Sequence, residues 1–284
     1  MVKKMIETME KILKKAQAEQ YAVAAYNVNN LEWARFILEA SEDSKTPVIL
    51  EVSESAVTYM GGFNVAAQMI RALVKDLKIT VPVAIHLDHG KSVESCKQAI
   101  DAGFTSVMFD GSQLPLEENI SKTKEVVNYA HQHGVTVEAE IGKVGGENSE
   151  IVHADPNECV RIVQESGIDF LAPALGSVHG LYHGEPHIDF DTTKKIRDLT
   201  GLPLVLHGGT GIPDEMLLEG IKSGICKVNI NTELQIAWSM ALRKYLNDNQ
   251  EVYDPRPIMK SGEMAMKEEI VYKNKLLGSY GKAN

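Results

Sequence analysis

The 284-residue sequence is poor in several features that mark whole classes of protein. Lys and Arg total 29 against 39 Asp and Glu, and the net charge of −10 argues against a general nucleic-acid or acidic-membrane surface. The three cysteines are far apart and odd in number, so neither a disulfide framework nor a CxxC metal motif fits. We therefore expect a reducing, cytoplasmic setting, in which any anionic ligand is held by a few local residues.

Long hydrophobic runs and linkers are also missing. No stretch reaches the roughly 20 apolar residues of a transmembrane helix, and the first twenty residues are charged throughout, unlike a signal peptide. No Pro-rich linker, low-complexity segment or sharp charge shift divides the chain. Because 44% of the residues are hydrophobic, the chain can bury a substantial core. We therefore expect one domain over residues 1–284, without membrane or nucleic-acid partners.

The sequence does contain eight short apolar runs that alternate with segments of helical spacing. The predicted strands span residues 21–29, 47–53, 81–88, 105–112, 135–142, 169–176, 202–209 and 226–232. Several intervening helices are expected to end at a glycine, as at Gly103, Gly134 and Gly167. Eight such units imply parallel pairing through right-handed crossovers, which favours an α/β fold of the (β/α)8, or TIM barrel, type. A doubly wound open sheet is the alternative, and extra helices are expected at the N-terminus and over residues 261–275.

Polar side chains gather at the carboxyl ends of the predicted strands, where barrels carry their catalytic residues. They are Asn27, Ser53, Asp88, His89, Asp110, Glu140, His179, His207, Asn229 and Asn231. Three imidazoles with one open position suit a catalytic Zn²⁺, so we predict that His89, His179 and His207 bind one. Each histidine alone would be a hydrogen-bonded strand end, and the metal site depends on closure of the barrel. His86 is expected to support a ligand rather than to be one.

Two further stretches are typical of anion sites. LHGGTGIPDE (206–215) follows the seventh predicted strand, so the amides of Gly208, Gly209 and Thr210 can approach a phosphate closely. KVNINTE (227–233) forms the eighth strand and its end, and barrels often bind phosphate between these two loops. A plain helix start with Pro213 in its first turn explains the same residues and is compatible with phosphate binding.

Four motifs carry a resemblance to a known family. They are LDHG (87–90), GSVHGLYHGEP (176–186), LVLHGGTGIP (204–213) and VNINTE (228–233), in this order. Together they resemble the class II, zinc-dependent ketose-bisphosphate aldolases, and the similarity extends over nearly the whole chain. Within that family, the sequences of these motifs are most similar to those of the fructose-bisphosphate aldolases of glycolysis and gluconeogenesis. Tagatose 1,6-bisphosphate, and a phosphorylated deoxyketonic acid from inositol breakdown, remain alternative substrates.

The resemblance implies roles for individual residues. His89, His179 and His207 would hold the zinc, Asp110 and Glu140 would orient ligands or hold zinc in an alternate position, and Asp88 would be the catalytic acid/base. The substrate, a phosphorylated sugar, would be bound by Asn27, Ser53, Gly180, Gly208, Gly209, Thr210, Asn229, Ile230, Asn231, Thr232 and Arg256. Arg256 would reach the second phosphate across a subunit boundary, so a homodimer or homotetramer is expected. The sequence leaves open whether a monovalent cation acts as an activator.

The sequence departs from the family pattern in one loop. The segment ENSEIVHADP after VGG (144–146) is several residues short and lacks the usual Glu-Asp pair. The family glutamate that exchanges the carbon-bound proton could be Glu147 or Glu150, and we assign Glu147. Gln113 stands where a histidine is common.

Three other functions compete with a metal-dependent aldolase. A Schiff-base aldolase needs a desolvated lysine, but Lys227 and Lys143 are both expected to be solvated. A metal-dependent sugar-phosphate epimerase could use the same residues but would need two opposed acid/base groups. A non-catalytic phosphosugar-binding protein would not depend on Asp88.

Overall fold

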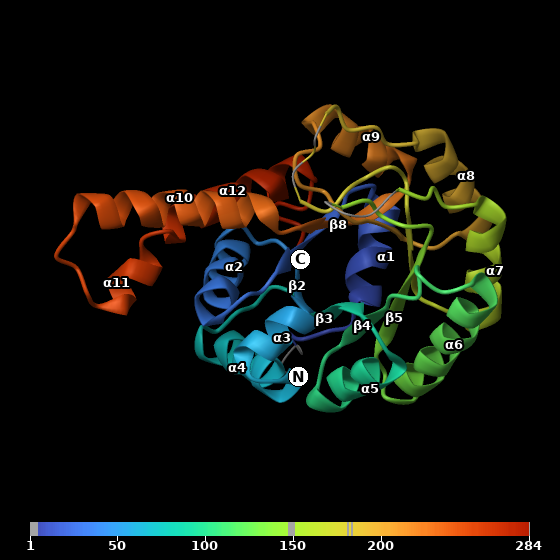
Figure 1. Cartoon of the computed structure of the whole chain (residues 1–284), viewed down its shortest axis with the longest axis horizontal. Coiled ribbons are helices and arrows are strands. Elements are labelled where there is room, and N and C mark those ends of the chain that lie inside the picture. The colour runs from blue at the N-terminus through green and yellow to red at the C-terminus, as the bar shows by residue number, and fades with distance from the viewer. Residues whose placement is uncertain (1–4, 147–150, 181, 183, 284) are drawn as a thin grey trace.

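A closed barrel of eight parallel strands forms the centre of the molecule (Figure 1). The computed structural model describes residues 5–146, 151–180, 182 and 184–283. Each strand pairs with the next in chain order, and β8 pairs with β1 to close the sheet. The strands are β1 (Val23–Asn27), β2 (Val48–Ser53), β3 (Val83–Gly90), β4 (Ser106–Phe109), β5 (Thr136–Ile141), β6 (Phe170–Pro173), β7 (Leu204–Leu206) and β8 (Ile225–Ile230). This confirms the predicted (β/α)8 barrel and excludes the open sheet.

Helices surround the barrel and extend beyond it at both ends of the chain. They are α1 (Met9–Glu19), α2 (Leu31–Asp43), α3 (Glu54–Met60), α4 (Phe63–Asp76), α5 (Val93–Ala102), α6 (Leu116–Gln132), α7 (Pro156–Ser166), α8 (Phe190–Thr200), α9 (Asp214–Ser223), α10 (Thr232–Asp248), α11 (Pro255–Lys260) and α12 (Glu263–Leu276). As expected, Gly103 and Gly167 end α5 and α7 in the left-handed conformation. Among the described residues, no helix is both long and apolar enough to cross a membrane.

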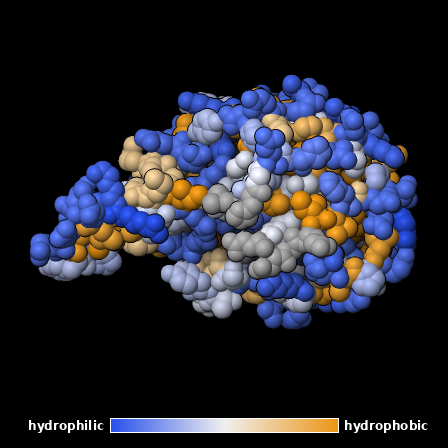
Figure 2. Space-filling model, turned by 45° about the horizontal axis from the view of Figure 1, so that its top comes forward, coloured by the Kyte–Doolittle hydropathy of each residue, from blue (hydrophilic) through white to orange (hydrophobic). Residues whose placement is uncertain are grey.

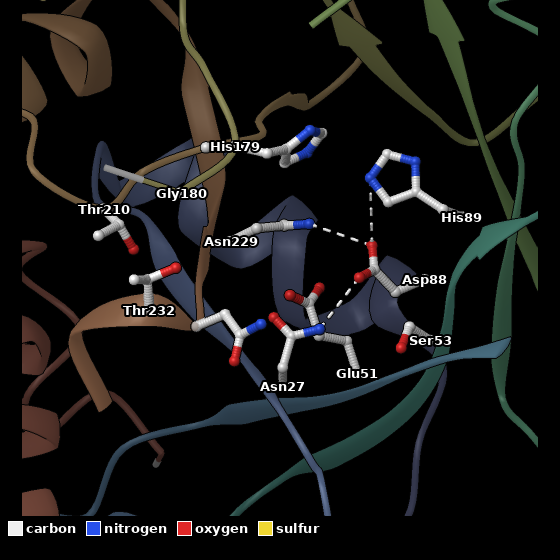
Figure 3. Close-up of a pocket in the computed structure, with 12 residues that line it drawn as sticks. Asn27, Glu51, Ser53, Asp88, His89, His179, Gly180, Thr210, Asn229 and Thr232 are labelled. Atoms are coloured by element: carbon white, nitrogen blue, oxygen red, sulfur yellow. Dashed lines mark hydrogen bonds and ion pairs between the residues drawn. The ribbon is translucent and has the colours of Figure 1, made fainter. Parts of the chain in front are cut away.

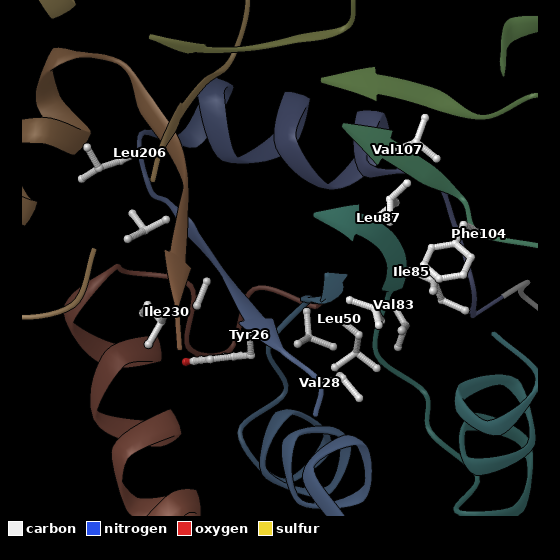
Figure 4. Close-up of a cluster of buried hydrophobic side chains, with 14 of the residues drawn as sticks. Tyr26, Val28, Leu50, Val83, Ile85, Leu87, Phe104, Val107, Leu206 and Ile230 are labelled. Carbon is white, nitrogen blue, oxygen red and sulfur yellow. The ribbon is translucent and has the colours of Figure 1, made fainter. Parts of the chain in front are cut away.

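The two faces of each strand pack against different surroundings because successive side chains point to opposite sides. Outward-facing residues such as Tyr26, Leu50, Ile85 and Leu206 form the apolar layer between the sheet and the helices (Figure 4). Inward-facing residues near the amino ends of the strands are also apolar and pack against α1. This second cluster comprises Met9, Ile12, Leu13, Ala16, Tyr21, Val23, Ala25, Ile49, Ala84, Phe170, Ala172, Val205 and Cys226. The helix α1 therefore closes the amino end of the barrel, and the carboxyl end remains for a site.

Two helices near the C-terminus project from the barrel as an arm (Figure 1). The arm consists of α10 and α11, and Leu234 is the one residue of α10 that is fully buried. The predicted C-terminal helix corresponds to α12, which packs against both α10 and α2. Exposed apolar side chains lie along the arm, and Figure 2 shows them among hydrophilic ones.

Candidate active site

Three histidines from different strand ends converge at the carboxyl end of the barrel. Each of His89, His179 and His207 offers a ring nitrogen within 4.8 Å of the others, a spacing that suits one metal ion. The Nδ1 of His207 lies 2.9 Å from the Nε2 of His89. The prediction that barrel closure brings these rings together is confirmed.

His89 reaches this centre through an unusual backbone conformation. Asp88 points into the barrel, so a regular strand would direct the next side chain outward. His89 instead has a φ of 49°, and the pairing of β3 with β4 shifts register between Leu87 and Gly90. A bulge of this kind re-aims side chains, and here it turns two consecutive residues toward the same space.

The remaining nitrogens of two histidines are held by carboxylates. The Nδ1 of His89 lies 2.8 Å from Asp110 Oδ2, and the Nε2 of His207 lies 2.8 Å from Glu138 Oε1. A carboxylate that accepts one ring N–H leaves the other nitrogen free as a ligand, which is the usual arrangement around metal-binding histidines. The donor set of three imidazoles therefore fits a divalent metal such as zinc.

Acidic side chains surround the point where the rings converge. Burial opposes a charged ring, but the Asp88 carboxylate and the hydrogen bond to Asp110 raise the pKa of His89 to about 10. Burial, together with the negative charge of Asp110, raises the pKa of Glu140 to about 8. His89, Asp110 and Glu140 also form a second group of three potential ligands. The electrostatic field at this position favours a cation.

Asp88 lies beside the histidines and is fixed by two amides. Its Oδ2 accepts from Asn27 Nδ2 at 3.0 Å and its Oδ1 accepts from Asn229 Nδ2 at 3.4 Å (Figure 3). Burial favours the protonated form, but the histidines, His89 first, lower the pKa of Asp88. The side chain is therefore an ionised, oriented carboxylate that can accept a proton.

A cavity of about 150 Å³ adjoins Asp88 and two of the histidines (Figure 3). It is lined by Asn27, Glu51, Ser53, Asp88, His89, His179, Gly180, Gly208, Thr210, Asn229, Asn231 and Thr232. Within the described part of the chain, the Oδ1 atoms of Asn229 and Asn231 have no hydrogen-bond partner. Both can accept a hydrogen bond from a hydroxyl group of a ligand in this cavity.

The loop after β7 depends on one glycine. Gly208 has a φ of 65°, and a Cβ there would lie 2.2 Å from the carbonyl oxygen of Val178. Only glycine permits this close approach, which brings the loop that carries His179 and Gly180 against the loop that carries Thr210. Residues of both anion-site stretches predicted from the sequence, 206–215 and 227–233, line the same cavity.

Three predicted site residues are placed differently from the rest, and a fourth lies outside the described residues. The N–H of Gly209 donates to the Asn229 carbonyl at 3.2 Å and is not free for a phosphate. The Ile230 side chain lies in the outward apolar layer, so it does not face the cavity (Figure 4). Arg256 lies on α11 with its side chain 88% exposed and paired with Asp254, outside the cavity lining. Glu147, like its alternative Glu150, lies outside the described residues.

Sequence reasoning singled out His86 and Lys227 individually but did not foresee a layer of ionisable side chains inside the barrel. Glu51, His86, Glu138 and Lys227 are all fully buried, one layer below the convergent histidines. A signal was present, because Glu138 lies two residues before Glu140 and therefore on the same, inward face of its strand.

The prediction that Lys227 is solvated is wrong. Its Nζ lies 2.9 Å from Glu138 Oε2 and 3.6 Å from Glu51 Oε2, inside the barrel. Burial works against its charge, but Glu138 and Glu51 raise the pKa of Lys227 above its usual value. A Schiff base requires a neutral amine, so this ion-paired lysine is unsuited to that chemistry. Lys143 is half-buried, and its backbone pairs with Val152.

Comparison with known proteins agrees with the site. The family profile described as "Fructose-bisphosphate aldolase class-II" matches residues 7–282. A fructose-bisphosphate aldolase of Geobacillus stearothermophilus is 54% identical over 281 residues, covering 97% of this chain and 98% of that protein. One from Staphylococcus aureus (strain Mu50) is 53% identical with the same coverage.

Solved structures show the same fold. The YdjI aldolase from Escherichia coli K12 superimposes with a TM-score of 0.87 at 36% identity, covering 99% of this chain and 100% of that one. The match of the family profile to almost the entire chain, together with these relatives, establishes the relationship. The chain belongs to the class II fructose-bisphosphate aldolase family.

Proposed function

We propose that this chain reversibly cleaves fructose 1,6-bisphosphate into dihydroxyacetone phosphate and glyceraldehyde 3-phosphate, with Zn²⁺ bound by His89, His179 and His207. The observation that carries the proposal is the position of Asp88. This ionised carboxylate, fixed by two asparagine amides, lies between the histidine cluster and a cavity large enough for a triose. The names of the curated relatives support fructose 1,6-bisphosphate as the substrate.

Different residues of the site have different roles in the reaction. When bound, the metal ion supplies Lewis-acid chemistry that offsets the negative charge developing on substrate oxygens. Asp88 accepts the proton of the C4 hydroxyl as the carbon–carbon bond breaks and returns it during condensation. Asn27 and Asn229 keep the Asp88 carboxylate in place, and Asn231 accepts a substrate hydroxyl.

The phosphate of dihydroxyacetone phosphate binds on the opposite side of the cavity, at Gly180, Gly208, Thr210 and Thr232. Glycines let the backbone approach the phosphate, and α10 begins at Thr232, so the positive end of its dipole favours an anion there. Ser53 lies at the cavity wall and contacts the substrate. Asp110 and Glu140 form, with His89, an alternate position for the metal. Glu147 remains our assignment for exchange of the carbon-bound proton.

The decisive test is metal analysis combined with a three-substrate cleavage assay. Fructose 1,6-bisphosphate should give a higher kcat/KM than tagatose 1,6-bisphosphate or the phosphorylated deoxyketonic acid. EDTA should abolish cleavage and Zn²⁺ should restore it. A tenfold preference for another substrate, about 1.4 kcal/mol in transition-state binding, would reject the assignment. Trapping of a borohydride adduct would reject the metal mechanism. A product that retains the whole carbon skeleton of the substrate would favour an epimerase.

We also propose that the active assembly is a homodimer or homotetramer formed through the arm. Met240 and Tyr253 are 64% and 94% exposed, respectively, a costly arrangement for apolar surface in a lone chain. Arg256 lies on the same arm, so pairing could carry it to a neighbouring cavity, where it would bind the second phosphate. Light scattering of the wild type and of Met240→Glu tests this. A monomeric wild type with full activity would reject the assembly.

A further inference from the structure

Lys227 is a charged side chain held entirely inside the barrel. Its exposure is 0%, and so is that of Glu138 and Glu51, the two carboxylates beside it. A buried charge is costly unless it is paired. The Nζ of Lys227 lies 2.9 Å from Glu138 Oε2 and 3.6 Å from Glu51 Oε2. The catalytic steps assigned above use none of these three groups, so their retention needs another explanation.

Glu138 connects the lysine to the histidine cluster. One of its oxygens accepts from Lys227, and the other accepts from the Nε2 of His207 at 2.8 Å. The opposite ring nitrogen of His207, Nδ1, lies 2.9 Å from the Nε2 of His89. A continuous path therefore runs from Lys227 through one carboxylate to the face of His207 that meets the other rings.

We propose that Lys227 is a positioning residue that determines metal affinity through Glu138. Lys227 fixes the carboxylate of Glu138, and the carboxylate fixes both the ring orientation of His207 and the proton on its Nε2. Its Nδ1 is then directed at the shared centre as a ligand. The inference rests on the proposed function only in that a divalent metal binds at the three histidines.

The second carboxylate beside Lys227 provides a matched comparison. Glu51 has the same burial as Glu138 and contacts the same lysine, yet neither of its oxygens accepts a hydrogen bond from a described residue. Burial raises the pKa of Glu51 well above its usual value, and this carboxyl group makes no hydrogen bond to His207. Because only Glu138 holds His207, the proposal predicts that they differ.

The experiment measures the dissociation constant of Zn²⁺ by competition with a chromophoric chelator. Removing a carboxylate partner of a metal-binding histidine typically weakens metal binding 10- to 100-fold. Lys227→Met and Glu138→Gln should each show a loss in this range, and Glu51→Gln should stay within about threefold of the wild type. The Lys227→Met/Glu138→Gln double variant should bind no more weakly than Glu138→Gln, because both changes break one path.

Three results would overturn the proposal. They are wild-type affinity in Lys227→Met, equal losses in Glu51→Gln and Glu138→Gln, and losses that multiply in the double variant. Lys227→Met leaves two buried carboxylates without their cation and can prevent folding. In that case it is replaced by the Lys227→Met/Glu51→Gln variant, which removes one of these carboxyl groups together with the lysine. Its loss of affinity should then match that of Glu138→Gln.

A second readout does not depend on metal or activity. In the metal-free protein, ¹⁵N spectra of the imidazoles should place the His207 proton on Nε2 in the wild type and in Glu51→Gln. In the Lys227 variant that folds, the two tautomers should be mixed, and an unchanged spectrum would contradict the positioning role. A wild type that binds no divalent metal would reject the proposed function, whereas this spectrum still tests the path from Lys227 to His207.

Discussion

The two ends of the barrel interior are formed by the same strands and are equally buried, but their inward-facing side chains differ in chemistry. Near the amino ends, Ile49 of β2 packs with Leu13 of α1 in an apolar cluster. Two residues further along β2, Glu51 occupies the next inward position, and it shares Lys227 with Glu138 of β5. Each step of two residues along a strand stays on one face, so the change from apolar to charged follows from side-chain choice alone.

This contrast separates stability from function. Burying apolar side chains stabilises the fold, at about 25 cal/mol per Å². Burying ionisable groups costs free energy, and several here lack a hydrogen-bond partner among the described residues, including both oxygens of Glu51 and the Nε2 of His86. The amino end therefore supports the structure, and the carboxyl end accepts a cost to hold reactive groups in place.

The largest expected effect is on catalysis, from a substitution of Asp88 at the carboxyl end of the barrel. Asp88→Asn keeps the shape and one of the two amide contacts, because its NH₂ group would face the second amide donor, and it removes the proton acceptor, so kcat should fall about 10³-fold. Steady-state cleavage of fructose 1,6-bisphosphate measures this, with Zn²⁺ content and melting temperature as controls. A variant that keeps more than a tenth of wild-type kcat would contradict the role.

At the amino end of the barrel, the expected effect of a substitution is on folding stability. Leu13→Ala leaves a cavity between α1 and the amino ends of the strands and should lower the free energy of unfolding by about 2–5 kcal/mol in urea titrations. Zn²⁺ affinity should remain within a few-fold of the wild type. Leu13→Met, which keeps most of the volume, should cost much less. The division into two ends would be lost if Leu13→Ala weakened metal binding as strongly as Glu138→Gln.

Removal of the metal tests whether the two ends are independent. At free Zn²⁺ about 100 times the dissociation constant, binding should add about 2.7 kcal/mol to stability, and chelation should remove it. Leu13→Ala, on α1 at the amino end, should lose the same amount as the wild type, because distant sites contribute additively. Paired thermal scans with and without EDTA measure this. A clearly smaller loss in the variant would show that the ends are coupled.

The smallest effect concerns Glu42, beside the amino end of β3. Its carboxylate accepts the backbone N–H groups of Thr80 and Val81. Burial opposes ionisation, but hydrogen bonds from Lys45 and Thr80 lower the pKa of Glu42 to about 2. The resulting stability is present above the usual glutamate pKa, about 4.3, and is lost as the pH falls toward 2.

Glu42→Gln should therefore cost about 1 kcal/mol at pH 7, and the difference from the wild type should shrink between about pH 5 and 2. Unfolding curves at several pH values measure it, and catalysis at neutral pH should be unaffected. A difference independent of pH would contradict the assigned ionisation.

The sequence by itself determined the barrel and most of the site. Alternating apolar runs and helical segments specify strand–helix units, and polar residues at strand ends indicate where they converge, as His89, His179 and His207 do. Local patterns carry this information because strand and helix periodicities are local properties.

Only the tertiary structure decided three further features. It turned His89 inward at a bulge, engaged the N–H of Gly209, and enclosed Lys227 between two carboxylates. None of these is a property of a residue and its neighbours in the chain. A lysine near the start of a strand is solvated or buried according to which side of a closed sheet it faces, and closure depends on all eight strands together.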